Sequence, residues 1–260
     1  MALKNTNPTK TKAWKKLTSH FSEIKDIHLK EFFKNDANRK TELSFAFNDL
    51  KVDFSKNRIT QETLDLLIEL ANEVDLKDAI QKYFSGDIIN TTEKRAVLHT
   101  ALRDSSSEKI IVNNTDVKTE IKAALKQVEK FSEKIISGGW KGFTGKSITD
   151  IVNIGIGGSD LGPNMVITAL QHYKNHLNTH FVSNIDGDHI AEIIKRLNPE
   201  TTLFVVVSKS FTTQETLTNA NTLKKWFLTS ATPKDIAKHF VAVSSNVENA
   251  TEFGISGENI

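Results

Sequence analysis

The spacing of apolar residues differs between the two parts of the chain. In the first part, apolar residues recur every three or four positions over long segments, as in amphipathic helices. In the second part, short apolar runs alternate with helical segments. Such an alternation favours a parallel sheet with helices on both faces. The pattern therefore predicts an α/β fold, an αβα sandwich around a parallel sheet, preceded by a mainly helical segment.

The first part, residues 1–114, is expected to be a helical scaffold with one pair of strands. Helical spacing predicts helices over residues 13–34, 60–74, 76–84 and 93–103. Thr60 is suited to cap the second of these helices, and Gly86 is suited to end the third. Apolar and polar residues alternate over 43–47 and 50–54, which predicts two short strands there.

The second part, residues 115–260, is expected to form one sheet domain. A long helix over residues 116–136 leads into it and ends at Gly138–Gly139. The apolar runs predicted as strands are 148–156, 180–184, 203–208 and 240–244. The helices predicted between them are 161–173, 188–197 and 213–228. Glycines are concentrated here, as the tight turns of an α/β fold require.

The stretch Ile151–Gly162 is the most informative part of the sequence. An apolar run stops abruptly in glycines, and Ser159 and Asp160 follow just before a helical segment. Glycines let the main chain approach a ligand closely, and the N–H groups in the first turn of a helix point at whatever lies there. The arrangement predicts an anion-binding site formed by the main chain, and phosphate is the most obvious ligand.

A second candidate loop follows the most apolar strand, Leu203–Val207. It places four hydroxyls and one ammonium at the C-terminal end of a strand, where open parallel sheets bind their ligands. These residues are Ser208, Lys209, Ser210, Thr212 and Thr213. Helix capping by Thr212 or Thr213, with a solvated lysine, is the alternative, but capping explains only one or two of the hydroxyls. We favour a phosphate site shared by the two loops.

Two segments of the sequence resemble nucleotide-binding motifs. Gly155-Ile-Gly157 begins like a dinucleotide fingerprint, but the third glycine would fall at Asp160. Because Asp186 follows the next strand, a dinucleotide-binding enzyme stays a minor alternative. Residues 139–147 resemble a P-loop, but Trp140 stands where the first glycine is required, and a helix, not a strand, precedes the segment. We reject the P-loop.

Several titratable residues have ordinary explanations. His172, His176 and His180 repeat every four residues, but no carboxylate accompanies them in that stretch, and a solvated helix end explains them better than a metal site. Glu215 could act as a general base. An acidic residue in the first turn of a helix more often stabilises the helix dipole.

Composition narrows the classes of function that remain. The chain has 260 residues, a formal net charge of +2 and no cysteine. The nearly balanced charge gives no reason to expect nucleic-acid or membrane binding, and the lack of cysteine excludes disulfides and thiolate chemistry. No segment approaches the roughly 18 apolar residues of a membrane span. We expect a cytoplasmic protein.

Four separated motifs resemble the glucose-6-phosphate isomerase family in order and spacing. They are Asp53–Asn57 (DFSKN), Asn90–Arg103, Ile154–Pro163 (IGIGGSDLGP) and Val207–Thr216 (VSKSFTTQET). The resemblance covers essentially the whole chain. It implies a sugar isomerase (SIS) fold for residues 115–260, with residues 1–114 belonging to a larger lobe of the full protein.

The resemblance also implies roles for the candidate residues. Gly158 and Ser159 match the first sugar-phosphate contact of the family. The phosphate-binding loop of the family is matched by Ser208, Lys209, Ser210, Thr212 and Thr213. Ser210 replaces the usual threonine there, which keeps the hydroxyl and loses a methyl group.

The reaction implied by the resemblance interconverts glucose 6-phosphate and fructose 6-phosphate through a cis-enediol, with no metal or redox cofactor. The glutamate base and ring-opening histidine of the family have no matching position here. We therefore expect an N-terminal fragment without catalytic residues, inactive alone, from a protein that is a homodimer at full length. A non-catalytic sugar-phosphate-binding module and a nicotinamide-dependent dehydrogenase stay as alternatives.

Overall fold

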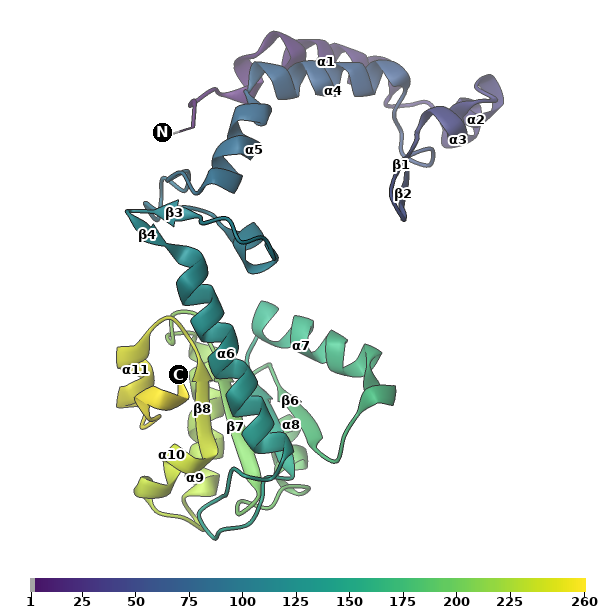
Figure 1. Ribbon diagram of the computed structural model, residues 1–260. Helices are drawn as coiled ribbons and strands as arrows, with labels where there is room; N and C mark the ends of the chain where they lie inside the picture. Colours follow the sequence, from purple (N-terminus) through teal and green to yellow (C-terminus); the bar gives the residue numbers. More distant parts are fainter. Residues whose placement is uncertain (1–2) are drawn as a thin grey trace. The chain divides into compact units, whose positions relative to one another are not determined.

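The computed structural model describes residues 3–260 and divides into two compact units (Figure 1). The first unit ends at Leu125, and the second unit runs from Lys126 to Ile260. The division falls within helix α6 (Val117–Ile136), which contributes residues to both units. The domain boundary expected between residues 114 and 115 stays a prediction.

The first unit consists of short helices and two small hairpins. Its α-helices are α1 (Lys12–Ile24), α2 (Leu29–Asn35), α3 (Arg39–Glu42), α4 (Gln61–Glu73) and α5 (Leu76–Ser85). Short 3-10 helices are η1 (Pro8–Lys10) and η2 (His99–Leu102). The antiparallel pairs are β1 (Ser44–Phe47) with β2 (Leu50–Asp53), and β3 (Ile111–Val112) with β4 (Thr115–Asp116). The predicted strand pair is thus confirmed as β1 and β2.

Two predicted helix ends are confirmed by their cap geometry. The Thr60 hydroxyl accepts a hydrogen bond from the N–H of Thr63 at 3.3 Å and begins α4. Gly86 ends α5 in the left-handed conformation, at φ +81°, which glycine adopts without a steric penalty. Caps of this kind are readable from sequence because one side chain satisfies the free backbone groups at a helix end.

Two helix predictions in the first unit are wrong. The segment 13–34 is two helices, because the His28 ring accepts a hydrogen bond from the N–H of Lys30 and starts α2. The segment 93–103 begins in a turn closed by a bridge between Asn90 and Arg95, and its helical part is only the 3-10 helix η2 (His99–Leu102). The Asn90 side chain accepts from the N–H of Glu93, so a local side-chain bond replaces the first helical bonds.

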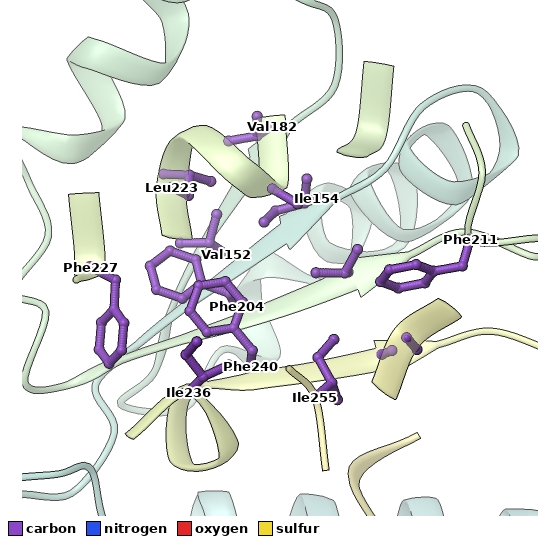
Figure 2. Packing of buried hydrophobic residues seen from close by; sticks show 14 of the residues in the cluster. Val152, Ile154, Val182, Phe204, Phe211, Leu223, Phe227, Ile236, Phe240 and Ile255 are labelled. Carbon is purple, nitrogen blue, oxygen red and sulfur yellow. The ribbon is translucent and has the colours of Figure 1, made fainter. Parts of the chain in front are cut away.

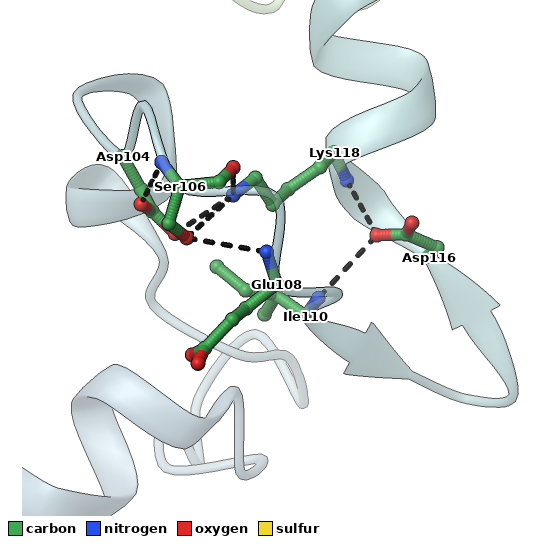
Figure 3. A network of polar contacts seen from close by, with 6 residues as sticks. All are labelled: Asp104, Ser106, Glu108, Ile110, Asp116 and Lys118. Carbon is green, nitrogen blue, oxygen red and sulfur yellow. Dashed lines mark hydrogen bonds and ion pairs between the residues drawn. The ribbon is translucent and has the colours of Figure 1, made fainter.

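A buried lysine fixes the start of α6 within the first unit (Figure 3). The Lys118 ammonium lies 2.9 Å from a carboxylate oxygen of Asp104 and donates to the main-chain oxygen of Ser106 at 2.6 Å. The Lys118 side chain is 5% exposed, so its charge depends on these partners rather than on water. The lysine holds the loop that begins at Asp104 against the helix.

The second unit is built on a four-stranded parallel sheet in the order β6-β5-β7-β8. Its strands are β5 (Asp150–Ile154), β6 (Asn178–Val182), β7 (Thr202–Val207) and β8 (Phe240–Val243). The helices that connect or follow them are α7 (Gly158–Ala169), α8 (Gly187–Ile194), α9 (Gln214–Phe227), α10 (Ile236–His239) and α11 (Val247–Glu252). Short 3-10 helices are η3 (Gln171–Tyr173), η4 (Pro233–Asp235) and η5 (Gly257–Asn259). All four predicted strands are confirmed.

Each face of the sheet has its own apolar core. On one face, Phe204 and Val206 pack with residues of α8, α9 and α10, and the Phe204 ring stacks on Phe240 with centroids 4.6 Å apart (Figure 2). On the other face, Leu203 packs with Ile135 of α6. Burying each large side chain contributes about 1.5–3 kcal/mol. Helices therefore cover both faces, and the predicted α/β class is confirmed.

Among residues 3–260, every helix is too short or too polar to cross a membrane.

Candidate functional site

The two candidate loops meet at the carboxyl ends of the two central strands of the sheet, β5 and β7. Ile154 at the end of β5 is paired with Val206 near the end of β7, so the loops that follow both strands start side by side. From β5 the chain passes through α7 to β6 on one side, and from β7 it passes through α9 to β8 on the other. Such a reversal of strand order opens a crevice where ligands bind. The structure brings Gly155–Ser159 and Ser208–Thr213 to this reversal.

Three glycines of the first loop differ in whether a side chain could replace their hydrogen atom. A Cβ atom on Gly155 would lie 2.7 Å from the Cβ of Ser159, so the turn can pack against α7 only with glycine here. Gly157 has φ +60° and ψ −124°, a conformation that other residues rarely adopt. A Cβ atom on Gly158 would meet nothing within 4 Å. The main chain at Gly158 therefore faces open space.

Helix α7 begins at Gly158, earlier than the predicted start at residue 161, so Ser159 lies in its first turn. The Asn153 side chain donates to the main-chain oxygen of Ser159 at 3.0 Å and fixes this turn to β5. Gly157 is the N-cap and has no side chain to cap the helix. Among residues 3–260, no group accepts a hydrogen bond from the N–H of Gly158. This N–H is available to an anion.

Asp160 lies in the same turn and is 6% exposed. Its Oδ1 atom has no hydrogen-bond partner among the described residues. A carboxylate at this position interacts favourably with the positive end of the helix dipole, by about 0.3–1 kcal/mol. The sequence places Asp160 just before a helix and where a dinucleotide fingerprint needs its third glycine, and neither position predicts its burial.

The second loop begins at Ser208, which is buried, and ends at Thr213. The Ser208 hydroxyl donates to the Thr213 hydroxyl at 3.3 Å, and the Ser208 N–H donates to the main-chain oxygen of Val243 at 3.1 Å. Thr213 is the N-cap of α9, yet its side chain makes no capping hydrogen bond. The part of the alternative explanation that assigns the cap to Thr213 is therefore wrong. Thr213 leaves the first turn of α9 without a cap from its own side chain.

Phe211 anchors the middle of this loop. Its ring is 2% exposed and packs edge-on against Phe253 with centroids 5.8 Å apart, while its main chain adopts φ +52°. Ser210 and Thr212 on either side are exposed, and their hydroxyl oxygens lie 2.6 Å apart. The buried ring thus turns the hydroxyls on both sides of it toward solvent.

Two serines outside the predicted site hold the main chain of Lys209 in place. The main-chain oxygen of Lys209 accepts hydrogen bonds from the hydroxyls of Ser244 at 3.1 Å and Ser245 at 2.8 Å, and from the N–H of Ser245 at 3.0 Å. Both serines directly follow β8. The sequence does show two hydroxyls at the end of β8. Their role could be predicted only by knowing that β8 lies next to β7 in the sheet.

The electrostatic arrangement suits an oxyanion. The N-termini of α7 and α9 follow adjacent strands, and each carries the partial positive charge of a helix dipole. The exposed Lys209 adds a full positive charge at the same edge. Hydroxyls and main-chain N–H groups can then donate to several oxygens of one phosphate group.

The three regularly spaced histidines have different surroundings, and the expected solvated helix end is wrong for His180, which lies in β6. The Nε2 atom of His180 lies 2.9 Å from Oδ1 of Asp150, and the His172 ring packs on Tyr173. Residues 3–260 contain no group of three or more His, Cys, Asp or Glu side chains placed to hold a metal ion.

Comparisons with known proteins agree on one family. The phosphoglucose isomerase family model matches residues 53–260. A glucose-6-phosphate isomerase from Christiangramia forsetii is 56% identical over 258 residues, which are 99% of this chain and 48% of that protein. The crystal structure of a glucose-6-phosphate isomerase from Chlamydia trachomatis matches with a TM-score of 0.76 and 26% identity, covering 97% of this chain and 50% of the other. The chain thus spans about half the length of these proteins.

Proposed function

Because this chain belongs to the phosphoglucose isomerase family, we propose that it carries the phosphate-binding half of a glucose-6-phosphate isomerase. The observation that supports this most strongly is the uncapped N-terminus of α9 beside the glycine loop before α7. Two unsatisfied helix N-termini at one strand reversal form a site for a dianion.

The phosphate group is held by main-chain and side-chain donors. Gly158 and Ser159 supply the first contact, where the main chain faces open space. The opposite wall is formed by Ser208, Lys209, Ser210, Thr212 and Thr213. Ser208 takes part through its hydrogen bond to Thr213, because its own side chain is buried.

The reaction that this site serves interconverts glucose 6-phosphate and fructose 6-phosphate. A proton leaves C2 and returns to C1 through a cis-enediol, so one substrate is rearranged with no net oxidation. Phosphate binding contributes by fixing the distance between the anchored group and the reacting carbons. The residues named here bind and orient, and the proton-transfer groups are proposed to lie in the part of the family's chain that this sequence does not span. The polypeptide alone is then inactive.

Two further expectations belong to the full-length protein. A homodimer and a cytoplasmic location are implied by the family resemblance, and both stay predictions.

The test separates binding from catalysis. Isothermal titration calorimetry with sorbitol 6-phosphate, which has no carbonyl group to isomerise, is expected to show one site per chain. Sorbitol without the phosphate is expected to show none. A coupled assay with fructose 6-phosphate is expected to show no turnover by the same preparation.

Other results would select another function. Near-normal turnover would show that the proton-transfer groups are already present. Binding of NAD in place of the sugar phosphate would favour a dehydrogenase. Equal heats of binding for sorbitol 6-phosphate and sorbitol would contradict the proposed phosphate site.

A further inference from the structure

Lys224 is a partly buried lysine in the last turn of α9. Its ammonium donates a hydrogen bond to the main-chain oxygen of Phe253, and the same nitrogen lies 4.2 Å from the centroid of the Phe253 ring. Among residues 3–260, no carboxylate forms an ion pair with this ammonium, and burial lowers its pKa below the ordinary value of 10.5. The lysine therefore exchanges water for one peptide oxygen and one aromatic face.

This environment is unfavourable for a lysine in itself. Removing an ammonium from water costs free energy unless an opposite charge compensates for it, and an apolar side chain at the same position would avoid that cost. The next residue, Lys225, shows the usual arrangement, because its side chain is exposed. A residue that departs from such a rule is often one that serves a functional site. The contacts of Phe253 indicate which site Lys224 serves.

The main-chain oxygen that Lys224 binds lies at the end of α11. Phe253 is the C-cap residue of that helix, and the chain leaves it through Gly254, which has φ +106°. The last carbonyl groups of a helix have no partner within the helix, and a lysine can supply one. Lys224 therefore fixes both the main chain and the ring of Phe253 to α9.

The Phe253 ring carries this restraint to the second candidate loop. It packs edge-on against Phe211 with centroids 5.8 Å apart, and Phe211 belongs to the apolar cluster of the sheet (Figure 2). Phe211 has φ +52°, a conformation that a bulky residue keeps only when its surroundings hold it there. The hydroxyls of Ser210 and Thr212 stand on either side of it. A displacement of Phe211 would therefore move both hydroxyls.

These contacts close a ring around the loop. Lys224 lies eleven residues beyond Thr213, which is about 16 Å along α9. One path from Thr213 to Lys224 is the helix, and the other runs through Phe211 and Phe253. The loop cannot move away from α9 unless one of the contacts along the second path breaks.

We propose that Lys224 is a positioning residue of the phosphate site, which acts through Phe253 and Phe211 to hold the hydroxyls of Ser210 and Thr212 in place. The inference rests on the proposed function, because it gives the loop the phosphate as its ligand. The competing explanation is that Lys224 only stabilises the end of α11. That explanation predicts a change in the free energy of unfolding, whereas positioning predicts a change in affinity and in the order of the loop.

Three variants of the chain separate the two explanations. Lys224→Met keeps the unbranched apolar stem and removes the ammonium. Lys224→Arg keeps a cation that can donate to the oxygen of Phe253 and lie over its ring. Lys225→Met makes the same change as the first variant at the exposed neighbour and is the matched control. Each variant is compared with the wild type by urea unfolding, by calorimetry with sorbitol 6-phosphate and by amide hydrogen exchange of residues 208–213.

In Lys224→Met, the dissociation constant should rise about three- to tenfold, the range expected when one aromatic contact is lost. Amide exchange of residues 208–213 should become faster. The free energy of unfolding should stay the same or increase, because a partly dehydrated charge has been replaced by an apolar group. Lys224→Arg should recover most of the affinity, and Lys225→Met should resemble the wild type.

Unchanged affinity and unchanged exchange of residues 208–213 in Lys224→Met would overturn the proposal. It would also be overturned by an equal effect in Lys225→Met, or by an affinity that falls only together with the free energy of unfolding. If the wild type itself does not bind sorbitol 6-phosphate, the proposed function fails. The exchange of residues 208–213 in Lys224→Met then still decides whether Lys224 orders the loop.

Discussion

The hydroxyl of Thr213 accepts a hydrogen bond from the hydroxyl of Ser208 at 3.3 Å, although Thr213 occupies the N-cap position of α9. A threonine at an N-cap ordinarily accepts from an N–H group in the first turn. By binding Ser208 instead, Thr213 leaves the positive end of a 14-residue helix open at the strand reversal. The first turn of α9 therefore lacks the stabilisation of a cap at the place where an anion is proposed to bind.

Thr213→Val and Lys209→Ala should each weaken binding of sorbitol 6-phosphate without unfolding the protein. The first change removes a hydroxyl and keeps the β-branched shape, and the second removes an exposed ammonium. A hydrogen bond to a charged group is worth about 1.5–3 kcal/mol, so the dissociation constant should rise about 10- to 100-fold. Isothermal titration calorimetry measures the change.

Lys195→Ala serves as the matched control, because it removes an exposed lysine from the same unit away from the two loops. The affinity of this variant should stay within a factor of about two. If all three variants lose affinity equally, overall charge and not a specific site governs binding.

Two neighbouring glycines should respond in opposite ways to alanine. Gly157→Ala should lower the free energy of unfolding by about 1–3 kcal/mol, because φ +60° is strained for any side chain. Gly158→Ala should leave stability nearly unchanged, since its methyl group enters open space. That same methyl group would occupy the space proposed for the phosphate, so affinity should fall.

Urea unfolding and calorimetry on both variants measure the two effects separately. Full affinity in Gly158→Ala would place the ligand elsewhere. Unchanged stability in Gly157→Ala would mean that the turn has another conformation.

Much of the second unit could be predicted because buried parallel strands appear as continuous apolar runs. Leu203–Val207 is such a run, and its glycine- or hydroxyl-rich neighbours mark the strand ends. The sequence favoured one site shared by the two loops, but the strand adjacency that brings the loops together could not be derived from it. The meeting of the loops depends on β5 and β7 being neighbours, which the order of strands along the chain does not give.

The first unit was harder to predict because single polar side chains decide its helix ends. His28 and Asn90 each bind a nearby N–H group and so replace helical hydrogen bonds. Apolar spacing continues through both positions and gives no sign of the break. In the candidate site, the buried ring of Phe211 and the bonds from Ser244 and Ser245 were missed for a related reason, since they depend on tertiary contacts.

Stability should decrease in mild acid because of His239. The ring is fully buried, its Nδ1 lies 2.6 Å from the oxygen of Thr202, and its Nε2 accepts from the N–H of Phe143 at 2.9 Å. Burial lowers the pKa of His239 below its ordinary value of 6.5. The unfolded chain therefore binds the proton more readily, and the stability present above pH 6.5 is lost progressively as the pH falls below it.

Urea unfolding between pH 5 and pH 8, in steps of about half a unit, should show this decrease in the wild type. In His239→Gln the protein should be less stable at pH 8, because the bond to Thr202 is altered, and the pH dependence should be weaker. Parallel curves for the two proteins would assign the acid sensitivity to other groups.

The ion pair between Asp104 and Lys118 should make the two single substitutions unequal. The Lys118 ammonium holds the pKa of Asp104 down at about 2, so the pair contributes stability above pH 3.8 and loses it between pH 3.8 and 2. Asp104→Asn leaves a buried ammonium without its counter-charge, whereas Lys118→Met leaves a carboxylate that is 32% exposed and can be hydrated. Thermal unfolding at pH 7 should therefore show the larger loss for Asp104→Asn. An equal or smaller loss would mean that the bonds from Lys118 to Ser106 suffice to hold the buried charge.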